Sequence, residues 1–117
     1  MSSKNQSPRE VARPFTPELH ALIEDPLFRQ VWERPGLSKR DRSLITVAAL
    51  VVLYRPEQLP AHLRAAIANG VTRAELSEAI THLAFYGGFP ASVSASGIAH
   101  ETLGALDDEQ KKERPSK

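Results

Sequence analysis

The stretch RSLITVAALVVLYRPEQLPAHLRAAIANG, residues 42–70, decides the fold. Its first part, residues 44–53, is apolar on nearly every side, and Arg55-Pro56 then interrupts it. Because the residue before a proline is disfavoured in the α region, the apolar helix ends there and a second helix carrying His62 follows. A helix that is apolar all round must be covered all round, and in so short a chain we expect a partner subunit to cover one side.

Capping signals indicate where the other helices begin and end. Such signals are a Ser or Thr followed three residues later by an acid, a proline in the first turn, and an Asn-Gly pair at the end. They occur at Thr16-Pro17, at Ser38 with Asp41, at Asn69-Gly70, and at Thr72 with Glu75. Gly87-Gly88 ends the next helix, and Pro90 begins a last helix rich in small residues.

The chain is predicted to be one small all-α domain with polar ends. Residues 1–14 are polar and contain two prolines without periodicity, which is typical of a flexible arm. Residues 15–106 carry five to six helices joined by short loops, and residues 107–117 form a charged, frayed tail. A domain of this size is often stabilised by oligomerisation.

The composition excludes several classes of function. The 117 residues have a net charge of +1 with basic and acidic residues interspersed, so neither nucleic acid nor an anionic membrane is an expected partner. The chain has no cysteine, which excludes disulfides, thiolate nucleophiles and Cys-bound metals. The N-terminus lacks the apolar region of a signal peptide, and the longest apolar run, Val47–Tyr54, is too short to span a bilayer. A cytoplasmic protein is expected.

His62 is the first candidate for a reactive side chain. It follows the break after the apolar helix, and Ala65 and Ala66, about one turn later, leave room beside its imidazole. An imidazole with a pKa of about 6.5 can give or take a proton at neutral pH. The alternative is a structural histidine at a helix junction, hydrogen-bonded to a backbone carbonyl.

Glu78, His82 and Tyr86 are a second candidate group, because a spacing of four residues stacks them along one face of a helix. They could form a proton relay in which Glu78 fixes the tautomer of His82, or an ordinary half-exposed face. No motif with metal-ligand spacing is present, so no metal site is predicted. His20 and His100 lie near the edges of the domain and are expected at the surface.

Several blocks within residues 34–91 occur in the order of a known family. They are RSLIT, HLRAA, NGVTR and the run A-x-Y-x-G-x-P. On these blocks the chain strongly resembles the carboxymuconolactone decarboxylase family, within the alkylhydroperoxidase D-like superfamily. The resemblance implies an all-α fold with a central helical hairpin, assembled as a homo-oligomer, either a trimer or a hexamer.

The thiol-dependent peroxidase branch of this superfamily carries a C-x-x-C pair, and a histidine follows its second cysteine by four residues. His62 matches that histidine, whereas Arg55 and Gln58 occupy the two cysteine positions. Ser43 occupies the position of an upstream acid in that branch. The resemblance therefore implies that this chain has no thiol peroxidase activity.

The decarboxylase branch is the better match and implies a lyase that needs no cofactor. Its substrate is 4-carboxymuconolactone, a small lactone of aromatic catabolism whose own carbonyl accepts electrons as carbon dioxide leaves. Such a site needs an acid, an anion anchor and an oxyanion donor. The predicted catalytic residues are His62 as the acid and Tyr86 or His82 as the donor. The predicted substrate-binding residues are Arg42 or Arg64 as the anchor, together with Ser43 and Glu78.

Two alternatives stay open. Gly87 and Gly97 occupy positions where the decarboxylases often carry a cysteine and a histidine. The chain could therefore be a paralogue that catalyses proton transfer or retro-aldol chemistry on another small carbonyl substrate. It could also be a non-catalytic oligomeric protein that binds a ligand.

Overall fold

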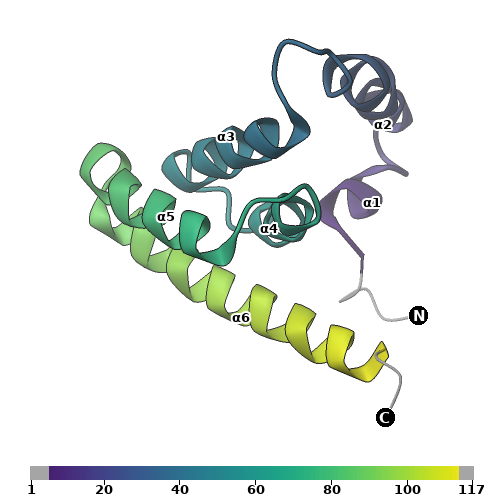
Figure 1. The fold of residues 1–117 in the computed structure, drawn as a ribbon. Coiled ribbons are helices and arrows are strands. Elements are labelled where there is room, and N and C mark those ends of the chain that lie inside the picture. The colour runs from purple at the N-terminus through teal and green to yellow at the C-terminus, as the bar shows by residue number, and fades with distance from the viewer. Residues whose placement is uncertain (1–5, 114–117) are drawn as a thin grey trace.

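The computed structural model describes residues 6–113, and all regular structure within that range is helical, as the sequence predicted (Figure 1). The elements are α1 (Pro8–Ala12), α2 (Pro17–Leu22), the helical segment η2 (Ile23–Val31), which is kinked at Asp25, α3 (Lys39–Val52), α4 (Leu59–Ala68), α5 (Arg73–Gly87) and α6 (Phe89–Glu113). Among these described residues, no helix is both long enough and apolar enough to cross a membrane.

The hydrophobic core lies between α3, α4, α5 and α6. Its buried side chains come from all four of these helices and from the short turn before α5. They are Val47, Val51, Leu59, Leu63, Ala66, Val71, Leu76, Ile80, Ala95 and Leu103. The apolar helix α3 is not covered all round, because Ile45 and Val52 remain 57% and 39% exposed.

The predicted caps are present at both ends of the loop between α4 and α5. Gly70 closes α4 with φ +101°, a conformation that glycine adopts without steric cost. Thr72 and Glu75 then form the predicted capping box, in which each side chain binds the backbone N–H of the other residue.

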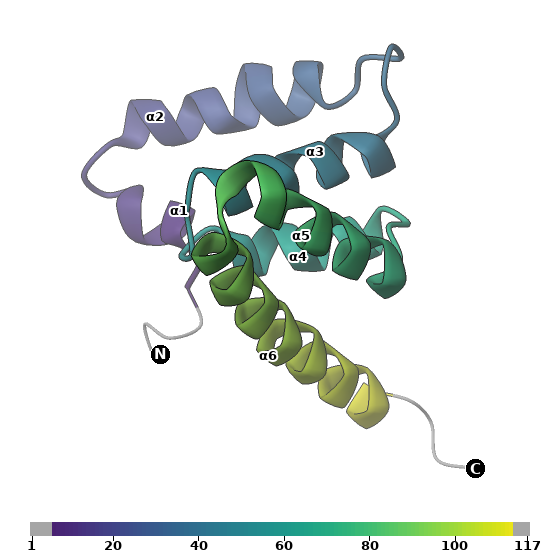
Figure 2. The same cartoon turned by 90° about the vertical axis from the view of Figure 1, so that its left-hand side faces the viewer.

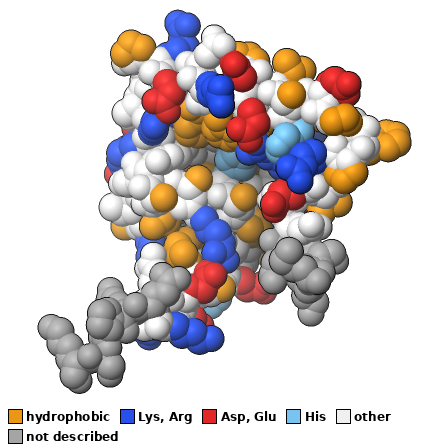
Figure 3. Space-filling view, turned by 90° about the vertical axis from the view of Figure 1, so that its right-hand side faces the viewer, with side chains coloured by type: hydrophobic (Ala, Val, Ile, Leu, Met, Phe, Trp, Pro, Cys, Tyr) orange, Lys and Arg blue, Asp and Glu red, His pale blue; other side chains and the backbone are white. Residues whose placement is uncertain are grey.

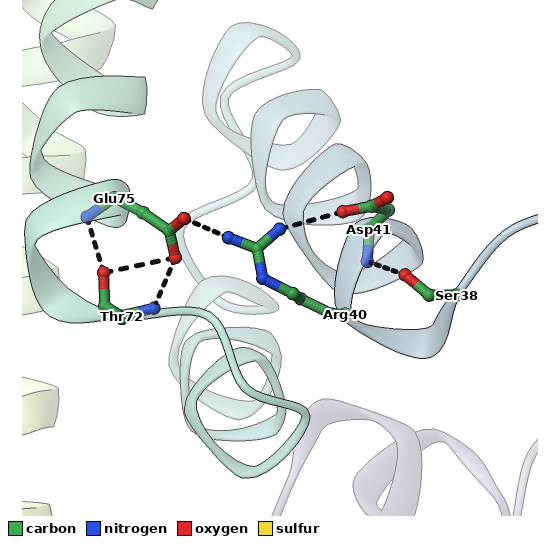
Figure 4. A network of polar contacts seen from close by, with 5 residues as sticks. All are labelled: Ser38, Arg40, Asp41, Thr72 and Glu75. Atoms are coloured by element: carbon green, nitrogen blue, oxygen red, sulfur yellow. Dashed lines mark hydrogen bonds and ion pairs between the residues drawn. The ribbon is translucent and has the colours of Figure 1, made fainter.

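A polar network joins the first turns of α3 and α5 (Figure 4). Ser38 caps α3 by accepting a hydrogen bond at its Oγ from the backbone N–H of Asp41 at 3.0 Å. The Asp41 carboxylate pairs with Arg40 instead of returning to Ser38, so this box is only half formed. Arg40 also reaches the carboxylate of Glu75. Glu75 therefore caps its own helix and holds a cation from a second one.

The hairpin of α5 and α6 turns at Gly88, which has φ +103° (Figure 1). Just before the turn, Gly87 lies against α3 so closely that a Cβ atom there would be 2.7 Å from Cγ1 of Val52. A side chain at this position would therefore push α5 away from α3.

The N-terminal part of the chain is more ordered than the sequence predicted. Residues 1–14 were expected to form a flexible arm, but residues 8–12 of that range form α1, capped by Ser7 in a complete capping box with Glu10. The run is short and apolar periodicity is missing from it, so composition alone favoured a loop. Residues 1–5 lie outside the described part of the chain.

The helices α1, α2 and η2 form an N-terminal helical unit, residues 8–31. Its α2 and η2 lie over α3 as a separate layer, and α1 lies lower, at the level of α4 (Figure 2). Its helices pack mainly on one another, and none of its residues is buried. Its larger apolar side chains stay 36–58% exposed over α2 and η2, namely Leu19, Leu22, Leu27, Phe28 and Val31.

The expected charged tail, residues 107–117, is helical through residue 113, because α6 continues without a break. Two cross-helix ion pairs tie this extension to the core. Arg64 of α4 binds Glu109 at 2.8 Å, and Arg73 of α5 binds Asp107. Long-range pairs of this kind leave no local signal in sequence. Residues 114–117 lie outside the described range.

Candidate functional site

His62 lies on α4 at the border of its buried side. It comes one turn after Leu59 and one turn before Ala66, both of which are buried in the core. The imidazole is half-buried, and this loss of hydration lowers the pKa of His62 from its ordinary value of 6.5. The side chain is therefore a neutral imidazole at pH 7 in the free protein.

Gln58 lies one helical turn before His62, on the same side of α4. Its Oε1 atom is shielded from solvent and accepts no hydrogen bond from the described residues. Leaving a buried amide oxygen unpaired is costly, and such atoms often mark ligand sites. The sequence identifies Gln58 as a helical neighbour of His62 and as the counterpart of a missing cysteine, but the unpaired state of its amide oxygen is visible only in the structure.

Arg42 is at the start of α3 and points toward the end of the N-terminal helical unit. Its Nη2 donates to the carbonyl oxygen of Arg34 at 3.2 Å, in the linker that follows η2. Its Nε is shielded from solvent and has no partner among the described residues. Arg42 therefore keeps a hydrogen-bond donor available for an anion.

Two other predicted substrate-binding residues have structural contacts instead. Ser43 is only 2% exposed, and its hydroxyl accepts a hydrogen bond from Nδ2 of Asn69 at 2.9 Å. Arg64 follows His62 by two residues and so points to the opposite side of α4, where it binds Glu109.

The predicted group on α5 lies on an exposed surface. The rings of His82 and Tyr86 pack with centroids 5.0 Å apart, and Tyr86 is 77% exposed. Glu78 and His82 line a shallow hollow beside Leu44 of α3. His62 lines neither this hollow nor the larger groove between α5 and α6, so the structure does not bring the two candidate groups into one pocket.

His20 was expected at the surface, yet its side chain is only 20% exposed. The loss of hydration, together with the guanidinium groups of Arg9 and Arg13, lowers the pKa of His20. Its Nε2 faces Oε1 of Glu24 at 3.8 Å, and Arg9 binds the same oxygen. His20 and Glu24 are four residues apart in the continuous run from α2 into η2, so their spacing could have indicated this pair, whereas Arg9 joins it from α1 without such a signal. His100 is exposed, as predicted.

Four buried polar atoms of α1, α2, α3 and the start of α4 have no partner among the described residues. They are Arg9 Nε, His20 Nδ1, Arg42 Nε and Gln58 Oε1.

The face of the molecule on which α1, α2 and α4 lie has a hollow with hydrophobic side chains at its floor. Histidine, basic and acidic side chains surround it (Figure 3). No three His, Asp or Glu side chains among residues 6–113 are grouped to hold a metal ion. The arrangement can therefore hydrogen-bond an anionic organic molecule and exchange a proton with it.

Comparison with known proteins agrees with this arrangement of helices. The profile of the carboxymuconolactone decarboxylase family matches residues 17–101. A 4-carboxymuconolactone decarboxylase of Acinetobacter baylyi is 43% identical over 89 residues, which cover 76% of this chain and just under two thirds (66%) of that protein.

Two further relatives match most of the chain. The nitrosuccinic acid decarboxylase npaB of Metarhizium robertsii is 36% identical over 104 residues, covering 89% of this chain and 73% of that protein. An uncharacterised 15.0 kDa protein of Paracoccus denitrificans is 32% identical over 122 residues, covering 89% of this chain and 90% of that protein. The family profile spans well over half of the sequence, and the chain belongs to the carboxymuconolactone decarboxylase family.

Proposed function

We propose that this protein is a decarboxylase that acts on a small organic acid without a cofactor, with His62 as the proton donor. The observation that carries the proposal is His62 itself, a half-buried imidazole one helical turn from Gln58, whose buried amide oxygen has no partner within the described residues. The names of two relatives, a 4-carboxymuconolactone decarboxylase and a nitrosuccinic acid decarboxylase, support the reaction class.

Both named compounds can lose carbon dioxide with an electron acceptor that they carry themselves. The bond between carbon and the carboxylate breaks, and its electron pair moves into a lactone carbonyl through a double bond, or into a nitro group. Carbon dioxide leaves, and the resulting enolate or nitronate takes up one proton on carbon. The protein therefore has to bind the acid, stabilise the developing oxyanion and supply that proton.

In this mechanism His62 supplies the proton and Arg42 anchors a carboxylate. Arg42 is the better anchor than Arg64, because its Nε has no partner within the described residues whereas Arg64 already binds Glu109. The amide nitrogen Nε2 of Gln58, and not its unpaired Oε1, is the better candidate donor to the oxyanion than Tyr86 or His82, since Gln58 lies one turn from His62.

Substrate binding prepares His62 for its role. The imidazole is neutral in the free protein because burial lowers its pKa. A bound carboxylate nearby favours the charged imidazolium and raises that pKa again. The acid is thus formed when the substrate is present, and solvent returns the proton after each turnover.

The test is release of carbon dioxide from 4-carboxymuconolactone and from 2-nitrosuccinate by the purified full chain. His62→Ala and His62→Gln should each lower kcat at least 100-fold, which is the usual contribution of a positioned proton donor. Glu101→Gln, which changes an exposed ionisable residue of α6, is the control and should retain full activity. Turnover by His62→Ala at the native rate would refute the assignment.

We also propose that the protein assembles as a homo-oligomer, with trimer and hexamer as the two expected states. The support is a groove of about 530 Å³ between α5 and α6, bordered by Phe85, Phe89 and Val93 with exposed fractions of 74%, 58% and 68%. Apolar surface of this extent usually marks an interface. Val93→Glu should lower the native mass measured by light scattering, and Thr81→Glu, at a polar position of the same groove, should lower it less.

A further inference from the structure

We infer that Arg9 and His20 of the N-terminal helical unit form a second anion site, which holds the distal carboxylate of a dicarboxylate substrate. This inference rests on the proposed decarboxylase function and adds residues that the family match at 17–101 includes only in part, since Arg9 precedes it. It assigns the N-terminal helical unit to substrate selection.

The geometry of the unit is centred on Glu24 of η2. Arg9 binds Oε1 of Glu24, and Nε2 of His20 lies 3.8 Å from the same oxygen. The Arg9 guanidinium also lies over the ring of Phe28, 5.5 Å from its centroid. Three helices are thereby joined, and the two side chains that could bind an anion are held next to each other.

Each of these two side chains retains one unused polar atom. Nε of Arg9 is shielded from solvent and donates no hydrogen bond within the described residues. Nδ1 of His20 is also shielded and has no hydrogen-bond partner there. Unpaired buried polar atoms are uncommon because each costs about 1–3 kcal/mol. A carboxylate has two oxygens, and one bound there can accept a hydrogen bond from each side chain.

The fixed charges around His20 balance, and a single bound carboxylate adds a negative charge that a protonated His20 neutralises. Arg9 and Arg13 bring two positive charges near His20, whereas Glu24 and Glu10 bring two negative ones. Glu10 is occupied in the cap at Ser7, from whose backbone N–H it accepts a hydrogen bond at 3.1 Å. Glu24 orients Arg9, as carboxylates behind a binding arginine commonly do. An incoming carboxylate would also favour the protonated form of His20.

The site is placed to share one ligand with the His62 region. Arg42 of α3 bonds to Arg34 directly after the N-terminal helical unit, so the start of α3 is tied to that layer. The hollow in Figure 3 lies on the face of the molecule to which α1, α2 and α4 are turned, and ionisable side chains surround it. A molecule bound there can contact the N-terminal helical unit at one end and α4 at the other.

The compounds that the two decarboxylase relatives are named for share the required feature. Nitrosuccinic acid and 4-carboxymuconolactone each carry two carboxyl groups, only one of which leaves. The retained carboxylate is a second group that a site can recognise. A monocarboxylate leaves the buried donors for this group unpaired, and that cost weakens its binding. Arg9 and His20 would bind the retained group.

The first experiment compares two substrates that differ only in this group. For the full chain, kcat/KM is measured with 2-nitrosuccinate and with 2-nitrobutanoate, which lacks the second carboxylate. Arg9→Gln and His20→Ala should each lower kcat/KM for 2-nitrosuccinate about tenfold or more and change that for 2-nitrobutanoate less than twofold. Arg29→Gln, at an exposed arginine of η2, is the control and should change neither value.

Equal losses with both substrates in Arg9→Gln and His20→Ala would overturn the inference, because they would indicate a structural role. Glu24→Gln should have the opposite effect on the binding of a dicarboxylate. It releases Arg9 from its ion pair, so succinate should inhibit this variant more strongly than it inhibits the native chain.

The second experiment does not depend on turnover. Succinate or butanoate is added to the ¹⁵N-labelled chain, and the imidazole resonances of His20 are followed by NMR. Succinate should shift them at concentrations at which butanoate does not. If neither nitro acid is decarboxylated while this selectivity is seen, the proposed reaction fails and the anion site stands. If His20 responds to neither acid, or to both equally, the anion site is wrong.

Discussion

Nδ2 of Asn69, at the end of α4, donates a hydrogen bond of 2.9 Å to the buried Oγ of Ser43, at the start of α3. This contact fixes the antiparallel register of the two helices that carry Arg42 and His62. The sequence argument assigned Ser43 to the substrate, whereas this bond gives its hydroxyl a structural partner.

Removing that bond should reduce stability and leave substrate affinity unchanged. Asn69→Ala leaves the buried Ser43 hydroxyl without a partner and should cost about 1–3 kcal/mol of the free energy of unfolding. Ser43→Ala removes the buried hydroxyl itself, so we expect a smaller loss. Chemical denaturation of both variants and of the double variant measures the coupling. A tenfold higher KM for Ser43→Ala, with unchanged stability, would show that Ser43 binds the substrate.

The pH dependence of turnover should reveal the lowered pKa of His62. The group acts as an acid, so activity falls as pH rises through its pKa. The profile of kcat/KM reports the free protein, in which burial lowers the pKa of His62, and its midpoint should lie below 6.5. The profile of kcat reports the complex, whose bound carboxylate raises that pKa.

The kcat midpoint should therefore lie at higher pH than the kcat/KM midpoint, and His62→Gln should lose both transitions. Activity measured from pH 5 to 9 in a constant ionic-strength buffer is sufficient. If activity instead rose with pH through this range, His62 would act as a base and the assigned direction of proton transfer would be incorrect.

Tyr54 ends α3 in a left-handed conformation, with φ +56°, although it is not glycine. The backbone N–H of Arg55 returns to the carbonyl of Leu50 at 2.9 Å, which is the closing pattern that glycine usually completes. Tyr54→Gly and Tyr54→Ala both remove the half-exposed ring, but only glycine relieves the left-handed strain. Tyr54→Gly should therefore be more stable than Tyr54→Ala by about 1 kcal/mol in thermal or chemical unfolding. Equal stability would show that the strain is absent in solution.

Two glycines in helices should respond to alanine in opposite ways. A Cβ on Gly87 would lie 2.7 Å from Cγ1 and 3.2 Å from the backbone Cα of Val52, whereas a Cβ on Gly97 would meet nothing within 4 Å. Gly87→Ala should cost about 1–3 kcal/mol by forcing α5 from α3. Gly97→Ala should stabilise α6 by about 0.5–1 kcal/mol. The melting temperatures of the two variants should shift in opposite directions, and a tolerated Gly87→Ala would mean that the hairpin sits farther from α3.

Most of the fold could be predicted because its signals are local. The caps at Ser38, Thr72 and Gly70 each depend on residues within one turn, and the structure places all three as expected. The extent of α6 could not be predicted in this way, since contacts between residues far apart in sequence hold its last turns, as in Arg64 with Glu109.

The candidate site was predictable only in part, for the same reason. His62 could be chosen from its position after the helix break, and the family resemblance identified the same residue. The four-residue spacing of His20 and Glu24 indicates that these two side chains meet, but nothing in the sequence brings Arg9 to them, because the break after α1 interrupts the helical period. Their association depends on how α1 folds back onto the following helices.

The carboxylate of Glu75 serves two helix starts at once, and this has a consequence for how the protein responds to acid. Hydrogen bonds from the backbone and hydroxyl of Thr72, aided by Arg40, lower the pKa of Glu75 below its usual value of 4.5. Its stabilising effect is present at neutral pH and is lost as pH falls through that lowered pKa. A single protonation then weakens the cap of α5 and releases Arg40 of α3 together, so acid should loosen both helices in one cooperative step.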